Sequence, residues 1–237
     1  MGEARRLGAP GVGARRGVLP ALPAHAGARL YDVLFPLVTR ERAWRPRLIS
    51  QLVSGLPVTT TPPGPAATPP PLILDIGAGT GTQALAIAAA APHARVVGLE
   101  PGNAVHAARA KPNPHGVEWV RGEAQRLPFP DDAVDRIVIS LALHHMTPAV
   151  RRAALAEFRR VLRPDGRLHV VEVGRPTDPL MRLMTAIARR LDDPVGMRDP
   201  YAGRVPALLH AAGFRVRPGR RRRTPAGVVE VTEALLG

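Results

Sequence analysis

The clearest feature of the hydrophobic pattern is an apolar run that ends in glycines. Residues 72–76 (LILDI) are apolar and partly β-branched, which is typical of a buried parallel strand. Gly77, Gly79 and Gly81 follow at alternate positions, and residues 81–91 have the composition of a helix that ends before a proline. Glycine admits positive φ, and the unpaired N–H groups of the helix start face the same space. This stretch therefore predicts a strand, a ligand-binding turn and a helix.

The rest of the chain alternates between strand-like and helix-like patterns. The predicted strands are 94–102, 117–120, 136–143, 167–173, 214–217 and 227–233, and the predicted helices are 103–111, 148–163, 178–191 and 203–214. Alternation of this kind favours an α/β domain around an open parallel sheet. We expect Arg220–Arg223, between the last two strands, to form a solvated hairpin loop rather than a phosphate clamp.

The part of the chain before the first strand divides by composition. Residues 1–28 are rich in Arg, Ala, Gly and Pro, so we expect a disordered arm. Residues 29–56 carry apolar side chains at helical spacing and predict an N-terminal helical cap, which Pro36 and Pro46 should divide into short pieces. Residues 57–71 contain seven prolines and no charge, so they predict an extended linker.

Composition narrows the class of protein. The chain has 237 residues, 45% of them hydrophobic, and we expect residues 72–237 to form one core domain. No run of 18 apolar residues predicts a membrane span, and the arginine-bearing start lacks the continuous apolar segment of a secretory signal. A cytoplasmic location is the default expectation. The absence of cysteine excludes thiolate metal sites and cysteine nucleophiles, and no metal site is predicted.

The formal net charge of +14 raises the question of nucleic acid. Residues 1–29 contain five arginines and one glutamate, and residues 215–237 contain six arginines and two glutamates, so much of the excess is terminal. Lys111 is the only lysine among the 33 basic residues, which favours a biased genome composition over a charge selected for polyanions. Binding or modification of RNA through the arginine-rich ends stays open as an alternative function.

The spacing of the glycines distinguishes a nicotinamide-binding fingerprint from other nucleotide-binding turns. A nicotinamide fingerprint requires glycine or alanine at position 82, where this chain has Thr82. This disfavours a nicotinamide oxidoreductase without excluding it. Glu100 stands at the end of the second strand, about 20 residues after the glycines, where an acid can accept hydrogen bonds from both hydroxyls of a ribose. The site therefore suits a nucleoside-containing ligand.

LDIGAGTG, with Asp75 two residues before the first glycine, resembles motif I of the class I S-adenosylmethionine (SAM) methyltransferases. Two further blocks resemble the ubiquinone and menaquinone methyltransferase-like group within them. One is the entry segment with the pairs Tyr31-Asp32 and Trp44-Arg45, and the other is FRRVLRPDGRLHVVEV, a helix, turn and strand. The resemblance implies a Rossmann-like, doubly wound, seven-stranded sheet with one reversed C-terminal strand, helices on both faces, and strands one and four adjacent at the ligand crevice.

The resemblance also implies that SAM is the cofactor, and it assigns binding roles to the positions of this chain that match the motifs of the family. Glu123 and Ala124 match the step that meets the adenine, and Tyr31 lies on the helix over the cofactor. The cofactor-binding residues expected on this basis are Asp75, Gly77, Ala78, Gly79, Gly81, Glu100, Pro101, Glu123, Ala124, Ser140 and Tyr31. The expected activity is transfer of a methyl group to an acceptor.

His144 and His145 follow the fourth predicted strand, next to the crevice. A neutral imidazole can accept a proton at pH 7, so either histidine is a candidate general base, although packing after the strand is an equal explanation.

The class of acceptor can be narrowed from the same region. Strand four lacks the Asn/Asp-Pro-Pro-Tyr/Phe loop of adenine-N6 methyltransferases, which argues against nucleic acid as the acceptor. Helices at both ends of the domain and the Met- and Leu-bearing helix 178–191 favour a small, partly apolar acceptor, quinone, phenolic or natural-product in type. Nothing in the sequence indicates the oligomeric state.

Overall fold

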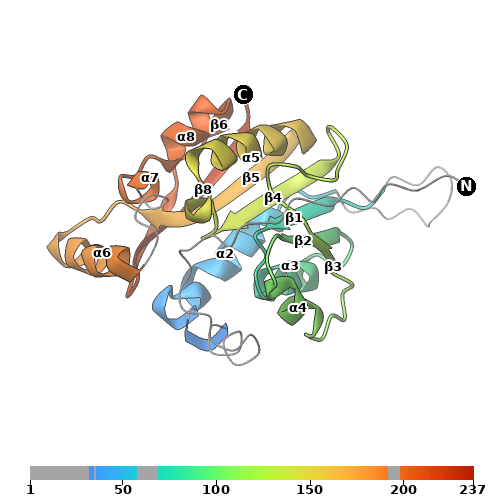
Figure 1. Ribbon diagram of the computed structural model, residues 1–237. Helices are drawn as coiled ribbons and strands as arrows, with labels where there is room; N and C mark the ends of the chain where they lie inside the picture. Colours follow the sequence, from blue (N-terminus) through green and yellow to red (C-terminus); the bar gives the residue numbers. More distant parts are fainter. Residues whose placement is uncertain (1–31, 35, 58–68, 192–197) are drawn as a thin grey trace, which may run out of the picture.

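The computed structural model describes residues 32–34, 36–57, 69–191 and 198–237, and its centre is one twisted sheet (Figure 1). The strands lie in the order β3-β2-β1-β4-β5-β8-β6, and β7 pairs with β8. Strands β1 to β5 are parallel, and β8 runs antiparallel to β5. The strands are β1 Leu72–Ile76, β2 Arg95–Glu100, β3 Glu118–Arg121, β4 Val134–Ser140, β5 Leu162–Gly174, β6 Phe214–Val216, β7 Arg220–Thr224 and β8 Gly227–Leu236.

This arrangement confirms the expected α/β fold with one reversed C-terminal strand, but the sheet has eight strands rather than seven. The additional strand is β7, so the prediction of a loop at Arg220–Arg223 is wrong. A tight turn causes the pairing: Gly227 has φ 113°, and the hydroxyl of Thr224 donates to the carbonyl of Gly227 at 2.8 Å. The chain is thereby folded back, and the arginine run lies along β8.

Helices cover both faces of the sheet (Figure 1). Side chains of α2 and α3 pack on one face, and side chains of α5 and α8 pack on the other. A short 3₁₀ helix, η1, follows β4. The bounds are α2 Glu41–Val53, α3 Thr82–Ala90, α4 Ala104–Arg109, η1 Leu143–His145, α5 Pro148–Val161, α6 Pro179–Leu191, α7 Arg198–Tyr201 and α8 Val205–Ala211.

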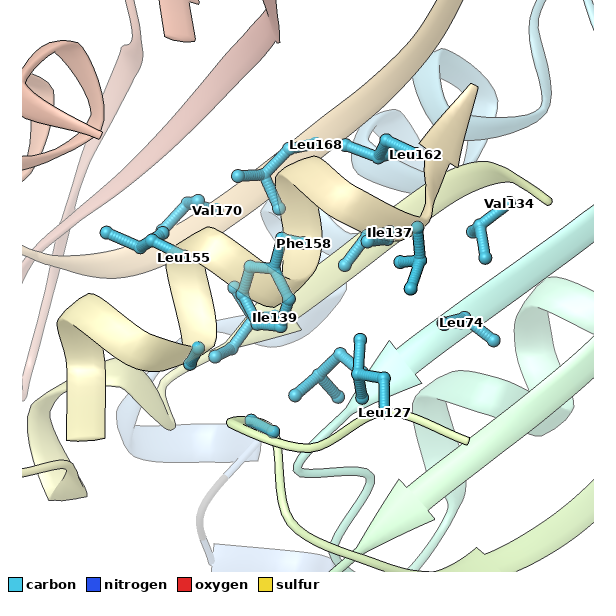
Figure 2. Close-up of a cluster of buried hydrophobic side chains, with 14 of the residues drawn as sticks. Leu74, Leu127, Val134, Ile137, Ile139, Leu155, Phe158, Leu162, Leu168 and Val170 are labelled. Atoms are coloured by element: carbon cyan, nitrogen blue, oxygen red, sulfur yellow. The ribbon is translucent and has the colours of Figure 1, made fainter. Parts of the chain in front are cut away.

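The two-residue period of the strands divides the core between these faces. In β1, Leu74 and Ile76 point toward α5, whereas Ile73 packs with α2 and α3. Figure 2 shows side chains of α5, among them Leu155 and Phe158, gathered over those of β4 and β5. Asp75 has the same parity as Ile73, so its carboxylate is directed toward α3. β1 thus directs the buried carboxyl group of Asp75 against α3, the helix that begins at the glycine turn.

Two predictions about local structure need correction. Pro46 does not break the N-terminal helical region, because it lies inside α2, whose buried Trp44, Leu48 and Leu52 hold the helix on the sheet. The chain turns instead at Arg40, which has φ 51°. The expected turn at 163–166 is instead an irregularity within β5. Leu162 and Arg167 stand on either side of it, and their partners on β4, Val134 and Arg136, are only two positions apart.

Several expectations lie outside the described residues. They concern the arm at 1–28, the position of Tyr31, and the linker at 57–71, most of which is not described. Residues 32–34 and 36–38 are helical, and residues 32–34 together with 36–40 are called the cap segment below. Among the described helices, none is long and apolar enough to cross a membrane.

Candidate cofactor and acceptor site

The three glycines after β1 adopt the conformation that the sequence predicts. Gly77, Gly79 and Gly81 have φ of 69°, 54° and 82°. A Cβ on Gly81 would lie 2.4 Å from the indole of Trp119, so this glycine is also required for packing against β3. A Cβ on Gly79 would meet nothing closer than 4.0 Å. The turn is therefore anchored at Gly81 and leaves open space at Gly79, where a ligand can approach the backbone.

A buried hydrogen-bond chain links β1, α3 and β4 beneath this turn. The Nε2 of Gln83 donates to Oδ1 of Asp75 at 2.9 Å, and the hydroxyl of Ser140 donates to Oε1 of Gln83 at 2.9 Å. Burial raises the pKa of Asp75 to about 7. Its Oδ2 is buried and has no hydrogen-bond partner within the described part of the chain. This oxygen is available to a cationic or hydrogen-bond-donating group of a ligand.

Glu100 reaches back from the end of β2 to the glycine turn. Its Oε2 accepts from the N–H of Gly79 at 2.9 Å, and its Oε1 accepts from the N–H of Gly102 at 2.8 Å. The two bonds fix the carboxylate at the crevice end of the sheet, and each oxygen keeps a second lone pair for another donor. Glu100 thus lies beside the glycines, and its contact with a ligand stays a prediction.

The cap segment closes over the turn. Asp32 accepts a hydrogen bond from the hydroxyl of Thr80, and its Oδ2 lies 2.6 Å from Nζ of Lys111. Lys111 Nζ also donates to the hydroxyl of Thr82 at 2.9 Å. These contacts, called the cap latch below, join three segments that are far apart in the sequence.

Beneath the cap latch lies a cavity of about 80 Å³ with an acidic lining. Asp32, Glu41 and Asp75 contribute carboxylates, and Arg45, which is ion-paired with Glu41, contributes the only guanidinium among the residues that line it. Burial raises the pKa of Glu41. The complete lining is Asp32, Pro36, Glu41, Arg45, Asp75, Gly77, Ala78, Gly79, Thr80, Thr82, Gln83, Ser140 and Leu141. Its charge suits a ligand with cationic groups.

The two candidate histidines differ in environment. His144 is buried, and its Nδ1 lies 2.7 Å from Oε1 of Glu172, while its backbone N–H donates to Oε2 of Glu172 at 3.1 Å. His145 is exposed, and the two ring centroids are 4.0 Å apart. Glu172 lies near the end of β5, beside the end of β4. His144 is therefore held by a buried carboxylate.

The structure brings part of the predicted cofactor set into one place. Asp75, residues 77–79 and Ser140 line the cavity, and Glu100 contacts it through Gly79. The other members of the set that the structure describes do not line this cavity, nor do the two candidate histidines. Glu123 is exposed and accepts from Gln125 at 2.5 Å, Ala124 is buried in the core, Pro101 is exposed, Gly81 packs under Trp119, and His144 and His145 lie in η1.

Sequence reasoning missed Gln83, Lys111 and Glu41 as residues of the site. Gln83 carries a recognisable signal, because it lies on the first turn of the helix after the glycines and can reach the strand residue Asp75. Lys111 carries none, since its partner Asp32 becomes a neighbour only when the cap segment packs over the glycine turn. The pair of Glu41 with Arg45 is a local one within α2, but its place beside the cavity depends on how α2 packs.

Fold and site together define an α/β domain with an acidic cavity at the carboxyl end of β1, the edge at which open parallel sheets bind nucleoside-type ligands. Comparison with known proteins agrees. A family model described as "Methyltransferase domain" matches residues 73–166. A demethylmenaquinone methyltransferase of Beutenbergia cavernae is 30% identical over 208 residues, which cover 79% of this chain and 79% of that protein.

Two further proteins are similar to this chain, the first in sequence and the second in fold. The uncharacterised methyltransferase YcgJ of Bacillus subtilis is 36% identical over 144 residues, 59% of this chain and 55% of that protein. A SAM-dependent methyltransferase structure from Aquifex aeolicus matches with a TM-score of 0.59 at 19% identity, over 91% of this chain and 100% of the other. The matched part of this chain spans about half the length, 46 to 55%, of the first curated relatives.

The chain belongs to the class I SAM-dependent methyltransferases, in the ubiquinone and menaquinone methyltransferase-like group. The resemblance of LDIGAGTG and the associated blocks to this family is thereby confirmed, and the cofactor of the family is SAM. The residues present suit that cofactor. SAM carries a ribose and two cationic centres, and the site offers the carboxylate of Glu100, an unpartnered oxygen of Asp75 and open space at Gly79.

Proposed function

We propose that this protein transfers a methyl group from SAM to a small, partly apolar acceptor of quinone, phenolic or natural-product type, at an oxygen, carbon or nitrogen atom. The observation that carries the proposal is the convergence of Asp75, the glycine turn and Glu100 at one end of the sheet. The relative named as a demethylmenaquinone methyltransferase, which matches 79% of this chain, supports an acceptor of this class.

Each residue has a role that follows from its position. SAM supplies a methyl group on a sulfonium, which is already an electrophile. The protein therefore has to bind the two reactants, orient them and exclude water. We assign Glu100 to the ribose hydroxyls and Asp75 to the cationic end of the cofactor. Glu123 and the backbone of Ala124 are assigned to the adenine, because a carboxylate can accept from its exocyclic amine.

His144 is our candidate for the general base. A nucleophile with a dissociable proton needs a nearby acceptor, and a base is effective when another group fixes its orientation. Glu172 contacts Nδ1 of His144 from a buried position, which favours the tautomer with the proton on Nδ1 and makes Nε2 the basic nitrogen of the ring. Glu172 is then a positioning residue. Burial and this contact favour His144 as the base over the exposed His145.

The surface near the site supports an apolar acceptor. The large apolar side chains that are exposed in the described part of the chain all belong to the cap segment and to α6: Val33, Leu34, Leu37, Val38, Leu180 and Leu183. The turn between β7 and β8 joins these two elements, since the N–H of Ala226 donates to the carbonyl of Val38 at 3.0 Å and Gly227 lies against Thr185 of α6. An acceptor with an apolar body would find matching surface there.

Calorimetric titration with SAM, its demethylated product and NAD tests the cofactor first. We expect micromolar binding of the first two and none of NAD, followed by methyl transfer to members of a quinone and phenol panel. Binding of NAD alone would contradict the cofactor assignment. SAM binding without transfer to any small acceptor, but with methylation of RNA, would move the acceptor class to nucleic acid.

A further inference from the structure

The arginine run on β7 is divided by the strand period into two pairs with different surroundings. Arg221 lies opposite Glu230 of β8 and is ion-paired with it at 3.1 Å, and Arg223 is ion-paired with Asp178 at 3.1 Å. Arg220 and Arg222 lie opposite Val231 and Val229. Successive side chains of a strand point to opposite faces. The second pair therefore projects on the face that α2 covers, away from the carboxylates that neutralise the first pair.

Helix α2 completes a pocket on this face. The pocket has a volume of about 350 Å³ and is lined by Trp44, Arg47, Leu48, Gln51, Arg220, Arg221, Arg222 and Val231. Trp44 and Leu48 are buried and, with Val231, supply apolar surface, while the arginines and Gln51 are exposed. We call this the arginine pocket. It combines an apolar part with several cationic groups from two elements that are more than 160 residues apart.

Three of its guanidinium groups have no counter-charge within the described part of the chain. Arg47, Arg220 and Arg222 form no hydrogen bond or ion pair there, in contrast to Arg221. Three like charges around one pocket repel each other, and an anion placed between them lowers that energy. Guanidinium groups also present paired N–H donors that match the oxygens of a phosphate.

We propose that the arginine pocket binds a phosphate-bearing small molecule whose apolar part lies on Trp44, Leu48 and Val231. The volume lies within the range of small-molecule sites and is sufficient for a diphosphate or for a phosphate with a short apolar group. The pocket is separate from the cofactor cavity: α2 presents Glu41 and Arg45 to the cavity and Trp44, Arg47, Leu48 and Gln51 to the pocket. The proposal is independent of the acceptor.

Titration of the full chain with inorganic pyrophosphate, followed by calorimetry, tests this proposal. We expect saturable one-to-one binding that weakens at least tenfold in Arg220→Gln/Arg222→Gln and severalfold in Arg47→Gln. The matched control is Arg126→Gln/Arg152→Gln, which removes the same charge from exposed arginines outside the pocket. Its affinity for pyrophosphate should stay within twofold of that of the unmodified protein. Thermal unfolding of each variant verifies the fold.

Two arms identify the source of the phosphate. The first arm measures binding of the protein to vesicles of phosphatidic acid. Binding that requires Arg220 and Arg222 and that pyrophosphate competes away would identify a lipid headgroup as the ligand. Pyrophosphate binding without vesicle binding would identify a free phosphorylated molecule. Equal weakening in the control variant, or no binding of millimolar pyrophosphate, overturns the proposal. A 20-nucleotide RNA that binds far more tightly, with a steep log-log salt dependence, overturns it in favour of a polyanion surface.

Discussion

At the scale of single residues, Glu100 has the most specific role. Its carboxylate is fixed by the N–H groups of Gly79 and Gly102, and we propose that it accepts hydrogen bonds from the ribose of SAM. Replacing it with Ala should weaken SAM binding by about 1.5 to 3 kcal/mol, the range for hydrogen bonds to a charged group. Calorimetric titration of the variant measures the loss directly.

A matched control separates ribose binding from a general effect of charge. Glu118 is an exposed acid on the neighbouring strand, and its partner is Arg95. Glu118→Ala should leave SAM affinity within twofold. Unchanged SAM affinity in a folded Glu100→Ala variant would show that the carboxylate does not contact the cofactor, and the sugar site would have to be assigned elsewhere.

His144 and His145 provide a second test, because they are adjacent but differently placed. His144→Gln should lower kcat by about 10²- to 10⁴-fold, the usual contribution of a general base, without changing SAM affinity. Glutamine retains a donor for Glu172, so the buried carboxylate keeps a partner. The measurement is the rate of methyl transfer across pH, in which the acidic limb of the profile should disappear.

The neighbouring variant His145→Gln is the internal control, since it makes the same substitution at an exposed position. It should retain kcat within about threefold. Equal losses in both variants would point to disturbance of η1, and full activity of His144→Gln would exclude His144 as the base. Glu172→Gln should reduce kcat less than His144→Gln, because Glu172 acts through the orientation of the imidazole.

At the scale of elements, the cap latch is the contact most suited to control cofactor exchange. Asp32 and Lys111 are each about a quarter exposed, at 24% and 26% of the side chain, and such a pair contributes at most about 1 kcal/mol. Lys111→Met should therefore raise the SAM dissociation rate by up to about fivefold. Stopped-flow fluorescence can follow the rate, because Trp119 packs against Gly81 of the glycine turn.

The control for the cap latch is Arg95→Met. Arg95 and Glu118 form an exposed ion pair between β2 and β3, with a contact as short as that of Lys111. This variant should leave the dissociation rate unchanged. An unchanged rate in Lys111→Met would mean that cap opening does not limit release of the cofactor.

Prediction of elements from sequence succeeded where the signal is local. The strand, glycine turn and helix at 72–90 follow from apolar periodicity and from glycines that must adopt positive φ. It failed at Pro46 and at β7, where tertiary contacts decide. Packing of Trp44, Leu48 and Leu52 holds α2 together across a proline, and pairing with β8 extends an arginine run that has no strand-like alternation.

The candidate site follows the same division. Asp75, the glycines and Glu100 were predictable because the chemistry of a short stretch places each of them. The ion pair of Asp32 with Lys111 and the contact of His144 with Glu172 join residues that are 79 and 28 positions apart. No local pattern encodes such contacts, since they depend on which elements become neighbours in the folded sheet.

At the scale of the whole molecule, two buried groups should have opposite effects on stability. Burial raises the pKa of Asp75 to about 7 and lowers the pKa of His169 to about 4. Between about pH 4 and 6.5, Asp75 is protonated in the folded state and ionised in the unfolded state, so rising pH favours unfolding. His169 is neutral when folded and protonated when unfolded, so rising pH favours folding. Each slope reaches at most about 1.4 kcal/mol per pH unit.

Single substitutions of Asp75 and His169 should reveal the contribution of each group to the pH dependence of the free energy of unfolding. Relative to the unmodified protein, the free energy of unfolding of Asp75→Asn should rise with pH between 4.5 and 6.5, and that of His169→Leu should fall. The double variant should return toward the original pH dependence. Urea unfolding at several pH values measures all three differences. Parallel curves for Asp75→Asn and the unmodified protein would contradict the burial argument for Asp75.

The cap latch described above contains the only lysine of the chain. Lys111 therefore offers the sole side-chain amine to an acylating reagent, and Asp32 and Thr82 hold that amine in the closed arrangement. Its rate of modification, read from the mass of the peptide that contains Lys111 so that the N-terminal amine does not contribute, reports how often the cap opens. Ligands that keep the cap closed should protect Lys111, so one chemical label can rank them without knowledge of the acceptor.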